Sequence, residues 1–461
     1  MGHDMTKGAI SSLRDFPAVE ILSGHPAFAP YMAALTRPLV VETVKTVVAA
    51  FKERFRTEKK AVTQDDLVGA VVAELKRLRL LNLEAVINGA GIIIHTNLGR
   101  APISKTMMAN ALEMICGYCN LEFDLAGGSR GKRGILVERL LALLCETEGG
   151  TIVNNNAAAL FIILNTLACR KEVIISRGEL VQIGGGFRIP DIMRKAGVKL
   201  IEVGATNRTS LTDYAEAITE RTRMILKVHR SNFMQVGFVE ETSLADLARL
   251  CRERGVILAH DLGSGLISMP KGVDTTNEPD VMSSVRTGVD LTCFSGDKLL
   301  GGTQAGLIVG QEALLSRIRK NPLFRVIRCD KIVFAVSTQV FAAYLDGRQF
   351  DDVPVWRMIT MSVSELKKRG EVIRRACQKK DVVLAATRAF LGGGSTPGQT
   401  IPSLALSIRS SVSPTTLAAR FRAHTPPIIG RVEDNDFLLD LRTIPPEKDA
   451  VIISAIKDLV K

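Results

Sequence analysis

Apolar residues near the beginning of the chain recur with the period of an amphipathic helix. Between Leu39 and Phe55, and again between Leu67 and Leu81, they stand three and four residues apart. Lysine and arginine residues fill many of the positions between them. The pattern predicts a small helical domain with a basic surface over residues 1–84.

After residue 85, short apolar runs alternate with helical patterns such as Leu244 to Arg254. This alternation predicts α/β architecture with a mainly parallel, doubly wound sheet in a large domain, residues 85–335. The glycine-punctuated run from Val86 to His95 is expected to open that domain. The other predicted strands are Glu172 to Ser176, Lys199 to Val203, Met224 to Val228, Val256 to Ala259 and Leu291 to Phe294.

A helical pattern from Met361 to Lys379 leads into a predicted smaller α/β domain, residues 336–461. Gly370 interrupts this pattern, which leaves open whether one helix or two form there.

Charge and composition narrow the class of protein. The 461 residues carry a formal net charge of +12, which suits an anionic partner such as nucleic acid but also simple solubility. Aromatic residues make up only 5% of the chain, which argues against stacking on single-stranded bases and favours a folded RNA read through its backbone.

The eight cysteines show no pattern of paired metal ligands beyond one C-x-x-C, Cys116 and Cys119. Scattered single cysteines are typical of a reducing compartment. No apolar run is long enough to span a bilayer, and Asp4 and Lys7 stand where a secretory signal would be apolar. We therefore expect a cytoplasmic protein without a membrane partner.

The candidate chemistry centres on the stretch from Cys293 to Gly302, in which Lys298 follows a mostly apolar run and precedes a glycine pair. A lysine held between a buried strand and a tight turn loses its proton through desolvation and becomes a nucleophilic amine, as a Schiff-base lysine must. The plain alternative is a solvated loop lysine.

Two further stretches support the reactive lysine. Asp261 ends a buried apolar run and precedes a glycine-rich turn, where a carboxylate would pair with a protonated pyridine nitrogen or merely cap the turn. The run from Asn154 to Ala159 places small residues at the predicted start of a helix, where free N–H groups bind phosphate or an asparagine acts as an ordinary cap.

With these residues in place, the chain resembles the pyridoxal-phosphate enzymes of fold-type I, the aspartate-aminotransferase superfamily. Within that superfamily it is similar to the bacterial L-seryl-tRNA(Sec) selenium transferase (selenocysteine synthase) family. The matching stretches occur in one order. They are His95 to Arg100, Asn120 to Asp124, Val153 to Ala159, Ser176 to Leu180, Phe187 to Asp191, Gly204 to Thr209, Asp261 to Gly265 and Phe294 to Gly306.

The resemblance implies conversion of L-seryl-tRNA(Sec) to L-selenocysteinyl-tRNA(Sec) with selenophosphate, through an aminoacrylyl intermediate on pyridoxal 5'-phosphate. It implies Lys298 as the cofactor-bearing base, with Asp297 assisting departure of hydroxide. Six residues would hold the cofactor besides Lys298: Asp261 at the ring nitrogen, Asn155, Asn156, Ala157 and Ser295 at the phosphate, and Asn232 at the ring hydroxyl.

Three arginines, Arg100, Arg325 and Arg328, are implied as the selenophosphate site, and a helix would bring the last two onto one face. The resemblance also implies tRNA(Sec) recognition by the N-terminal domain and a homodecamer built as a ring of dimers. The chain departs from the family pattern at Thr303, which replaces a proline, and around Glu179 to Gln182, where no aromatic residue is present to cover the cofactor.

Two other classes of function fit parts of the sequence. A pyridoxal-phosphate lyase or transferase acting on a small amino acid or amino sugar would need the same lysine and aspartate, but no basic N-terminal domain. An RNA-binding or scaffold protein with an inactive fold would need neither Lys298 nor Asp261.

Overall fold

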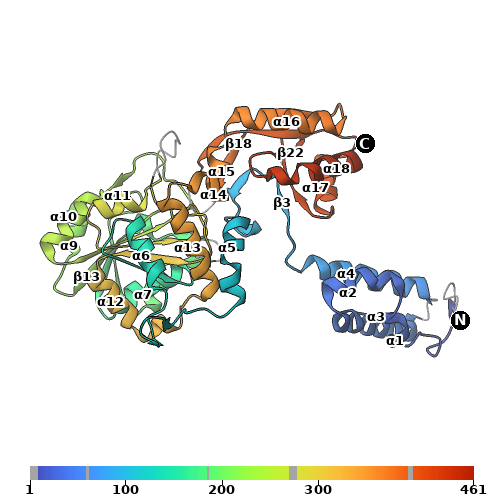
Figure 1. Cartoon of the computed structure of the whole chain (residues 1–461), viewed down its shortest axis with the longest axis horizontal. Helices are drawn as coiled ribbons and strands as arrows, with labels where there is room; N and C mark the ends of the chain where they lie inside the picture. Colours follow the sequence, from blue (N-terminus) through green and yellow to red (C-terminus); the bar gives the residue numbers. More distant parts are fainter. Residues whose placement is uncertain (1–8, 59–61, 184–185, 269–277, 393–397, 461) are drawn as a thin grey trace. The chain divides into compact units, whose positions relative to one another are not determined.

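The computed structural model describes residues 9–58, 62–183, 186–268, 278–392 and 398–460 (Figure 1). The chain divides into two compact units, Met1–Val86 and Ile87–Lys461. The first boundary lies beside the one expected after residue 84. The further division expected after residue 335 falls inside the second unit and stays a prediction.

The N-terminal unit is helical, with α1 (Val19–Ser23), α2 (Ala29–Leu35), α3 (Arg37–Glu58) and α4 (Gln64–Leu80). A capping box formed by Thr63 and Asp66 begins α4, because each residue bonds the backbone N–H of the other. The apolar faces of the helices share a core of their own that includes Leu22, Phe28 and Leu67. Both helices predicted here are confirmed.

A seven-stranded sheet organises the larger part of the second unit. Its order is β11-β8-β13-β15-β16-β17-β7, and the first five strands are parallel neighbours. β17 runs antiparallel to both of its neighbours. All five predicted strands are confirmed. The bounds are β7 (Gly149–Val153), β8 (Glu172–Ser176), β11 (Lys199–Val203), β13 (Thr222–Val228), β15 (Ile257–Gly263), β16 (Leu291–Ser295) and β17 (Gly306–Gly310).

Helices cover both faces of this sheet, as the predicted doubly wound architecture requires (Figure 1). On one face, α7 (Asn156–Ala168), α8 (Ile189–Lys195) and α12 (Glu312–Lys320) share an apolar cluster with the strands. On the other face, α9 (Leu211–Ala217) and α10 (Leu244–Arg254) pack against alternate strand residues. Strands inside the sheet such as β8 and β16 are therefore buried on both sides, which explains their mostly apolar runs, whereas the edge strand β11 is partly exposed.

A second sheet, of order β21-β22-β19-β18-β4, is built mostly from the C-terminal region. Its strands are β4 (Ile92–Ile94), β18 (Val382–Gly392), β19 (Thr400–Ile408), β21 (Arg431–Glu433) and β22 (Asp436–Asp440). β4 lies parallel to β18, and β3 (Ile87–Asn88) pairs with β20 (Ile428–Ile429). The run expected to open the large domain therefore hydrogen-bonds to the end of the chain instead.

Helix α16 (Val363–Cys377) runs unbroken through Gly370. A Cβ atom at Gly370 would lie 2.6 Å from Leu384 Cδ2 and 2.9 Å from Leu441 Cδ1. The glycine therefore allows the helix to pack closely on the C-terminal sheet, which is why it does not end the helix.

None of the helices in the described parts of the chain is long and apolar enough to cross a membrane.

Candidate active site

The lysine and aspartate predicted from the sequence meet at the carboxyl ends of two adjacent strands. Asp261 lies in β15 and is the register partner of Cys293 in β16, and Lys298 lies in the turn that follows β16. The carboxyl end of a parallel sheet is where ligands bind in open α/β folds.

Hydrogen bonds fix the turn that carries Lys298. The N–H of Leu299 donates to the carbonyl oxygen of Ser264 at 3.0 Å, which ties the turn to the loop after β15. The N–H of Ala101 donates to the carbonyl oxygen of Asp297 at 3.2 Å, and the N–H of Gly301 closes the turn onto Lys298 at 2.9 Å. The lysine is therefore attached to a rigid part of the fold and not to a free loop.

The environment of Lys298 favours its neutral amine. The residue keeps some exposed surface, but its amine lies deep enough that burial lowers its pKa from the usual value, and the charge of Arg100 adds to this effect. Asp261 and Asp297 oppose the shift through their negative charges. A neutral, positioned amine is what attack on an aldehyde requires.

Asp261 is buried, and burial raises the pKa of its carboxyl group. Four neighbours act against that rise: the side chain of Asn156, the charge of Lys298, the thiol of Cys293 and the nearby His229. Asn156 Nδ2 donates to Asp261 Oδ1 at 2.8 Å. The carboxylate is thus held in a definite orientation at the end of the strand.

The start of helix α7 faces the same end of the sheet. Asn155 is its N-cap, and Asn155 Oδ1 accepts from the N–H of Ala158 at 2.9 Å. Asn156 and Ala157 occupy the first helical positions, where N–H groups have no acceptor within the helix and suit an anion. Gly306 packs directly against this start, since a Cβ atom there would lie 2.1 Å from the carbonyl oxygen of Asn155.

Asp297 and Arg100 form an ion pair beside the lysine. Arg100 Nη1 lies 2.6 Å from Asp297 Oδ2, and the Asp297 side chain is buried while that of Arg100 is 41% exposed. Arg100 has a φ of 62°, a left-handed conformation that residues other than glycine adopt infrequently. The predicted anion-binding arginine and the predicted catalytic aspartate are therefore in direct contact.

The other two predicted anion-binding arginines, Arg325 and Arg328, lie in the segment that follows α12. Arg325 ends the short 3₁₀ helix Pro322–Arg325, so it does not share a helix face with Arg328. Arg328 Nη1 lies 3.4 Å from Glu122 Oε1. Between the two arginines, the carbonyl oxygen of Ile327 accepts from the N–H of Asn154 at 2.9 Å. The arginine segment thus runs past the start of α7, and no hydrogen bond or ion pair among the described residues joins it to Arg100.

Ser295 is buried at the end of β16, whereas Asn232 is exposed. Asn232 Nδ2 donates to the carbonyl oxygen of Gln182 at 2.8 Å. Its neighbour Ser231 is buried, and a Cβ atom placed on Gly263 would lie 3.8 Å from Ser231 Oγ and 3.9 Å from Lys298 Nζ. Ser231 and Lys298 thus both lie close to Gly263, and the contact of Asn232 with the ring hydroxyl of the cofactor stays a prediction.

The residues around Lys298 fit pyridoxal phosphate. Two buried side-chain atoms here, Asn156 Oδ1 and Ser264 Oγ, have no hydrogen-bond partner among the described residues, so both are ready to bond a bound molecule. A lysine whose pKa is lowered by burial, a buried carboxyl group and N–H groups at a helix start match the aldehyde, ring nitrogen and phosphate of that cofactor.

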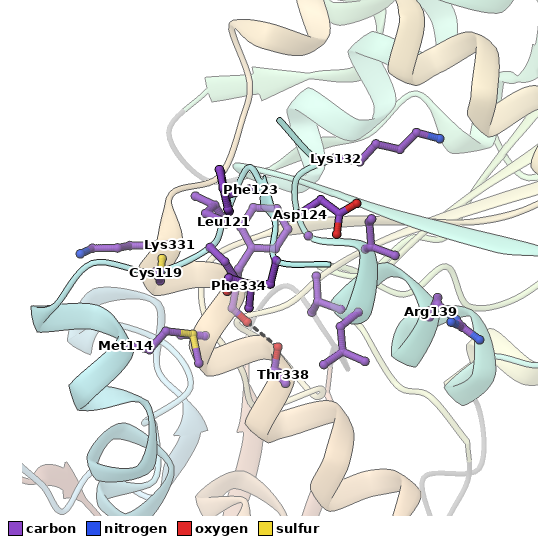
Figure 2. Close-up of a pocket in the computed structure, with 18 of the residues that line it drawn as sticks. Met114, Cys119, Leu121, Phe123, Asp124, Lys132, Arg139, Lys331, Phe334 and Thr338 are labelled. Carbon is purple, nitrogen blue, oxygen red and sulfur yellow. Dashed lines mark hydrogen bonds between the residues drawn. The ribbon is translucent and has the colours of Figure 1, made fainter. Parts of the chain in front are cut away.

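A large groove in the described residues lies apart from the lysine. It has a volume of about 1070 Å³ and lies among α5 (Lys105–Cys116), α6 (Ile135–Leu144), α13 (Lys331–Leu345) and the 117–134 segment (Figure 2). Most of its wall is apolar, and Phe123 and Leu136 are 48% and 63% exposed. The groove contains none of the site residues named above.

Comparison with known proteins identifies a family. Residues 86–445 match the family described as L-seryl-tRNA selenium transferase. The L-seryl-tRNA(Sec) selenium transferase of Geotalea uraniireducens is 40% identical over 97% of this chain and 99% of its own length. Those of Geobacter sulfurreducens and Aquifex aeolicus are each 41% identical, over 95% and 88% of this chain and 95% and 92% of their own lengths.

Among solved structures, D-glucosaminate-6-phosphate ammonia-lyase has a TM-score of 0.60 to this chain at 18% sequence identity, covering 83% of this chain and 97% of that one. This likeness concerns the fold and agrees with the expected fold-type I architecture. The match over residues 86–445 and the nearly full-length relatives together place this chain in the L-seryl-tRNA selenium transferase family.

Proposed function

We propose that this protein converts L-seryl-tRNA(Sec) to L-selenocysteinyl-tRNA(Sec), with pyridoxal 5'-phosphate as its cofactor. The observation that carries the proposal is the buried Lys298 beside Asp261, in a chain whose relatives of that name align over nearly its whole length. A scaffold protein would have no use for this costly burial of two ionisable groups.

Lys298 would hold the cofactor through its amine, Asp261 would face the ring nitrogen, and the α7 start with Ser295 would receive the phosphate. When bound, the cofactor supplies an electron sink that stabilises negative charge at the α-carbon of the seryl group. Lys298 would be the base that removes the α-proton, because its lowered pKa favours the neutral amine.

Asp297 and Arg100 would act on the β-carbon side of the substrate. Asp297 would assist departure of the hydroxyl group as hydroxide, and Arg100, whose Nη1 lies 2.6 Å from Asp297 Oδ2, would hold the Asp297 carboxylate in place. Arg100 together with Arg325 and Arg328 would bind selenophosphate, since guanidinium groups match phosphate oxygens. The separation of the arginine segment from Arg100 within one chain is consistent with a site completed by a second subunit.

The N-terminal unit would recognise the tRNA, and the overall charge of +12 supports binding to its phosphates. The protein would form a homo-oligomer, and the exposed apolar groove of Figure 2 supports self-association because a monomer rarely leaves such a surface in water. A ring of dimers is the arrangement that the family resemblance implies. The cytoplasm, where charged tRNA is available, is the proposed compartment.

Replacement of the lysine tests the proposal directly. Lys298→Ala should abolish the visible absorbance that the purified protein acquires with pyridoxal 5'-phosphate, and should stop selenocysteinyl-tRNA(Sec) formation. Lys227→Ala, which removes another largely buried lysine, bonded to Glu179, is the matched control and should retain the absorbance. Retention of the absorbance by Lys298→Ala would refute the assignment.

A further inference from the structure

Asp261 is held by two side chains that the sequence did not mark for this task. Asn156 Nδ2 donates to Asp261 Oδ1 at 2.8 Å from the first turn of α7. Cys293 is the register partner of Asp261 in the neighbouring parallel strand, so its buried thiol lies on the same side of the sheet as the carboxyl group, where it lowers the pKa of Asp261. The two contacts come from different elements, one from the helix and one from the sheet.

Each of these groups can serve as a donor. Asn156 presents its amide N–H₂ to an oxygen that only accepts, so the orientation of the amide is settled. Cys293 is 2% exposed, and burial together with the negative charge of Asp261 raises the pKa of its thiol well above the usual value. The thiol therefore keeps its proton at neutral pH and can donate it to the carboxylate.

We propose that Asn156 and Cys293 are positioning residues, which hold the Asp261 carboxylate ionised and directed at the ring nitrogen of the cofactor. The inference rests on the proposed function, because Asp261 needs such a hold only if it pairs with a protonated ring. Without the two donors, a buried carboxylate takes up a proton and loses its attraction for that ring. This role differs from the phosphate contact that the sequence suggested for Asn156.

Titration of cofactor-free, full-length protein with pyridoxal 5'-phosphate tests the inference without tRNA or selenium. The affinity is read from the visible absorbance of the lysine-bound cofactor. Asn156→Ala should weaken it about tenfold, the value of one hydrogen bond to a charged group. Asn156→Asp, which keeps the shape but adds a second carboxylate, should weaken it further.

Replacement of Cys293 tests the inference independently of Asn156. Cys293→Ala should weaken cofactor binding about threefold, because a thiol is a weak donor. Cys293→Ser should restore most of the affinity, since a hydroxyl donates in the same place. Asn165→Ala, on the same helix, and Cys251→Ala, buried on α10, are the matched controls and should bind as the wild type does.

The second readout is the lowest pH at which the protein still binds pyridoxal 5'-phosphate, which is the acid limit of cofactor binding. The groups facing Asp261 are Asn156, Lys298, Cys293 and His229. Loss of either neutral donor should raise the Asp261 pKa and move this limit to higher pH.

Wild-type affinity and an unchanged acid limit in Asn156→Ala, Asn156→Asp and Cys293→Ala would overturn the inference and leave the proposed function intact. A wild-type protein that acquires no absorbance would refute the proposed function itself. Asn156→Asp and Cys293→Ser nearly preserve side-chain volume, so they decide the question even if truncation to alanine disturbs folding.

Discussion

Burial and attraction act in opposite directions on Lys298 and Asp261. Burial favours the neutral form of each side chain, whereas the charge of each favours ionisation of the other. In the cofactor-free protein, the raised pKa of Asp261 shows that burial outweighs the favourable contacts. The site therefore destabilises the empty protein at neutral pH, as expected of a site preorganised for a charged ring.

Asp261→Asn should consequently stabilise the cofactor-free protein. Since the folded-state pKa of Asp261 lies above its ordinary value of 3.8, the carboxyl group stabilises the folded state below that pH and loses this contribution as the pH rises through the folded-state pKa. Thermal unfolding at a series of pH values checks the sign. The advantage of the asparagine variant should be smallest near pH 3.8 and grow toward neutral pH, and an advantage that is largest in acid would contradict it.

Sequence reasoning located these residues only as far as local pattern allows. Lys298 and Asp261 were predictable because each stands where an apolar run meets a glycine-rich turn. The contact of Asn156 with Asp261 joins residues 105 positions apart, and no local pattern encodes it. Ser231 is buried and its neighbour Asn232 is exposed, a difference that only the folded chain reveals.

At the scale of elements, the parallel strands were the most predictable feature. Their burial on both faces by α7 and α10 demands continuous apolar runs, and such runs are visible in the sequence. The pairing of β4 with β18 was missed, because hydrogen bonding between distant segments leaves no periodic signal. Whether Gly370 ends the helix could not be predicted, because its packing partners Leu384 and Leu441 lie in other elements of the chain.

Two glycine substitutions should have opposite effects on two elements. Gly306→Ala would place a Cβ atom 2.1 Å from the carbonyl oxygen of Asn155, so it should cost about 2 kcal/mol of unfolding free energy. It should also weaken cofactor binding by displacing the start of α7. Gly69→Ala in α4 meets no atom within 4 Å and should stabilise the N-terminal unit by up to about 1 kcal/mol.

Denaturant unfolding followed by circular dichroism measures both glycine variants, with cofactor absorbance as the second signal. Equal stability of Gly306→Ala and the wild type would show that α7 can shift without cost.

At the scale of the whole molecule, the two units have separate apolar cores. The second unit contains all the proposed catalytic residues, so a chain of residues 87–461 should still acquire the cofactor absorbance. It should lose preference for tRNA(Sec) over bulk tRNA(Ser), measured by titration at fixed, near-physiological salt because affinity depends on ionic strength. Undiminished preference in the shortened chain would place recognition elsewhere.

The groove of Figure 2 allows a test of assembly. Leu136→Glu places a charge on an exposed apolar side chain of α6 and should lower the molar mass measured by light scattering, because a charge buried in an interface is costly. Val372→Glu, on the exposed face of α16, is the control and should leave the mass unchanged. Equal masses for wild type and Leu136→Glu would exclude this groove from the interface.

The pairing of β4 with β18 has a consequence for synthesis on the ribosome. The chain makes β3 and β4 before any strand of the large sheet, yet their partners β20 and β18 come only near its end. All seven strands of the large sheet, by contrast, are complete once Gly310 has been made. The nascent protein can therefore form its catalytic sheet early, while the short segment before it can pair only after Gly392 and Ile429 have been made.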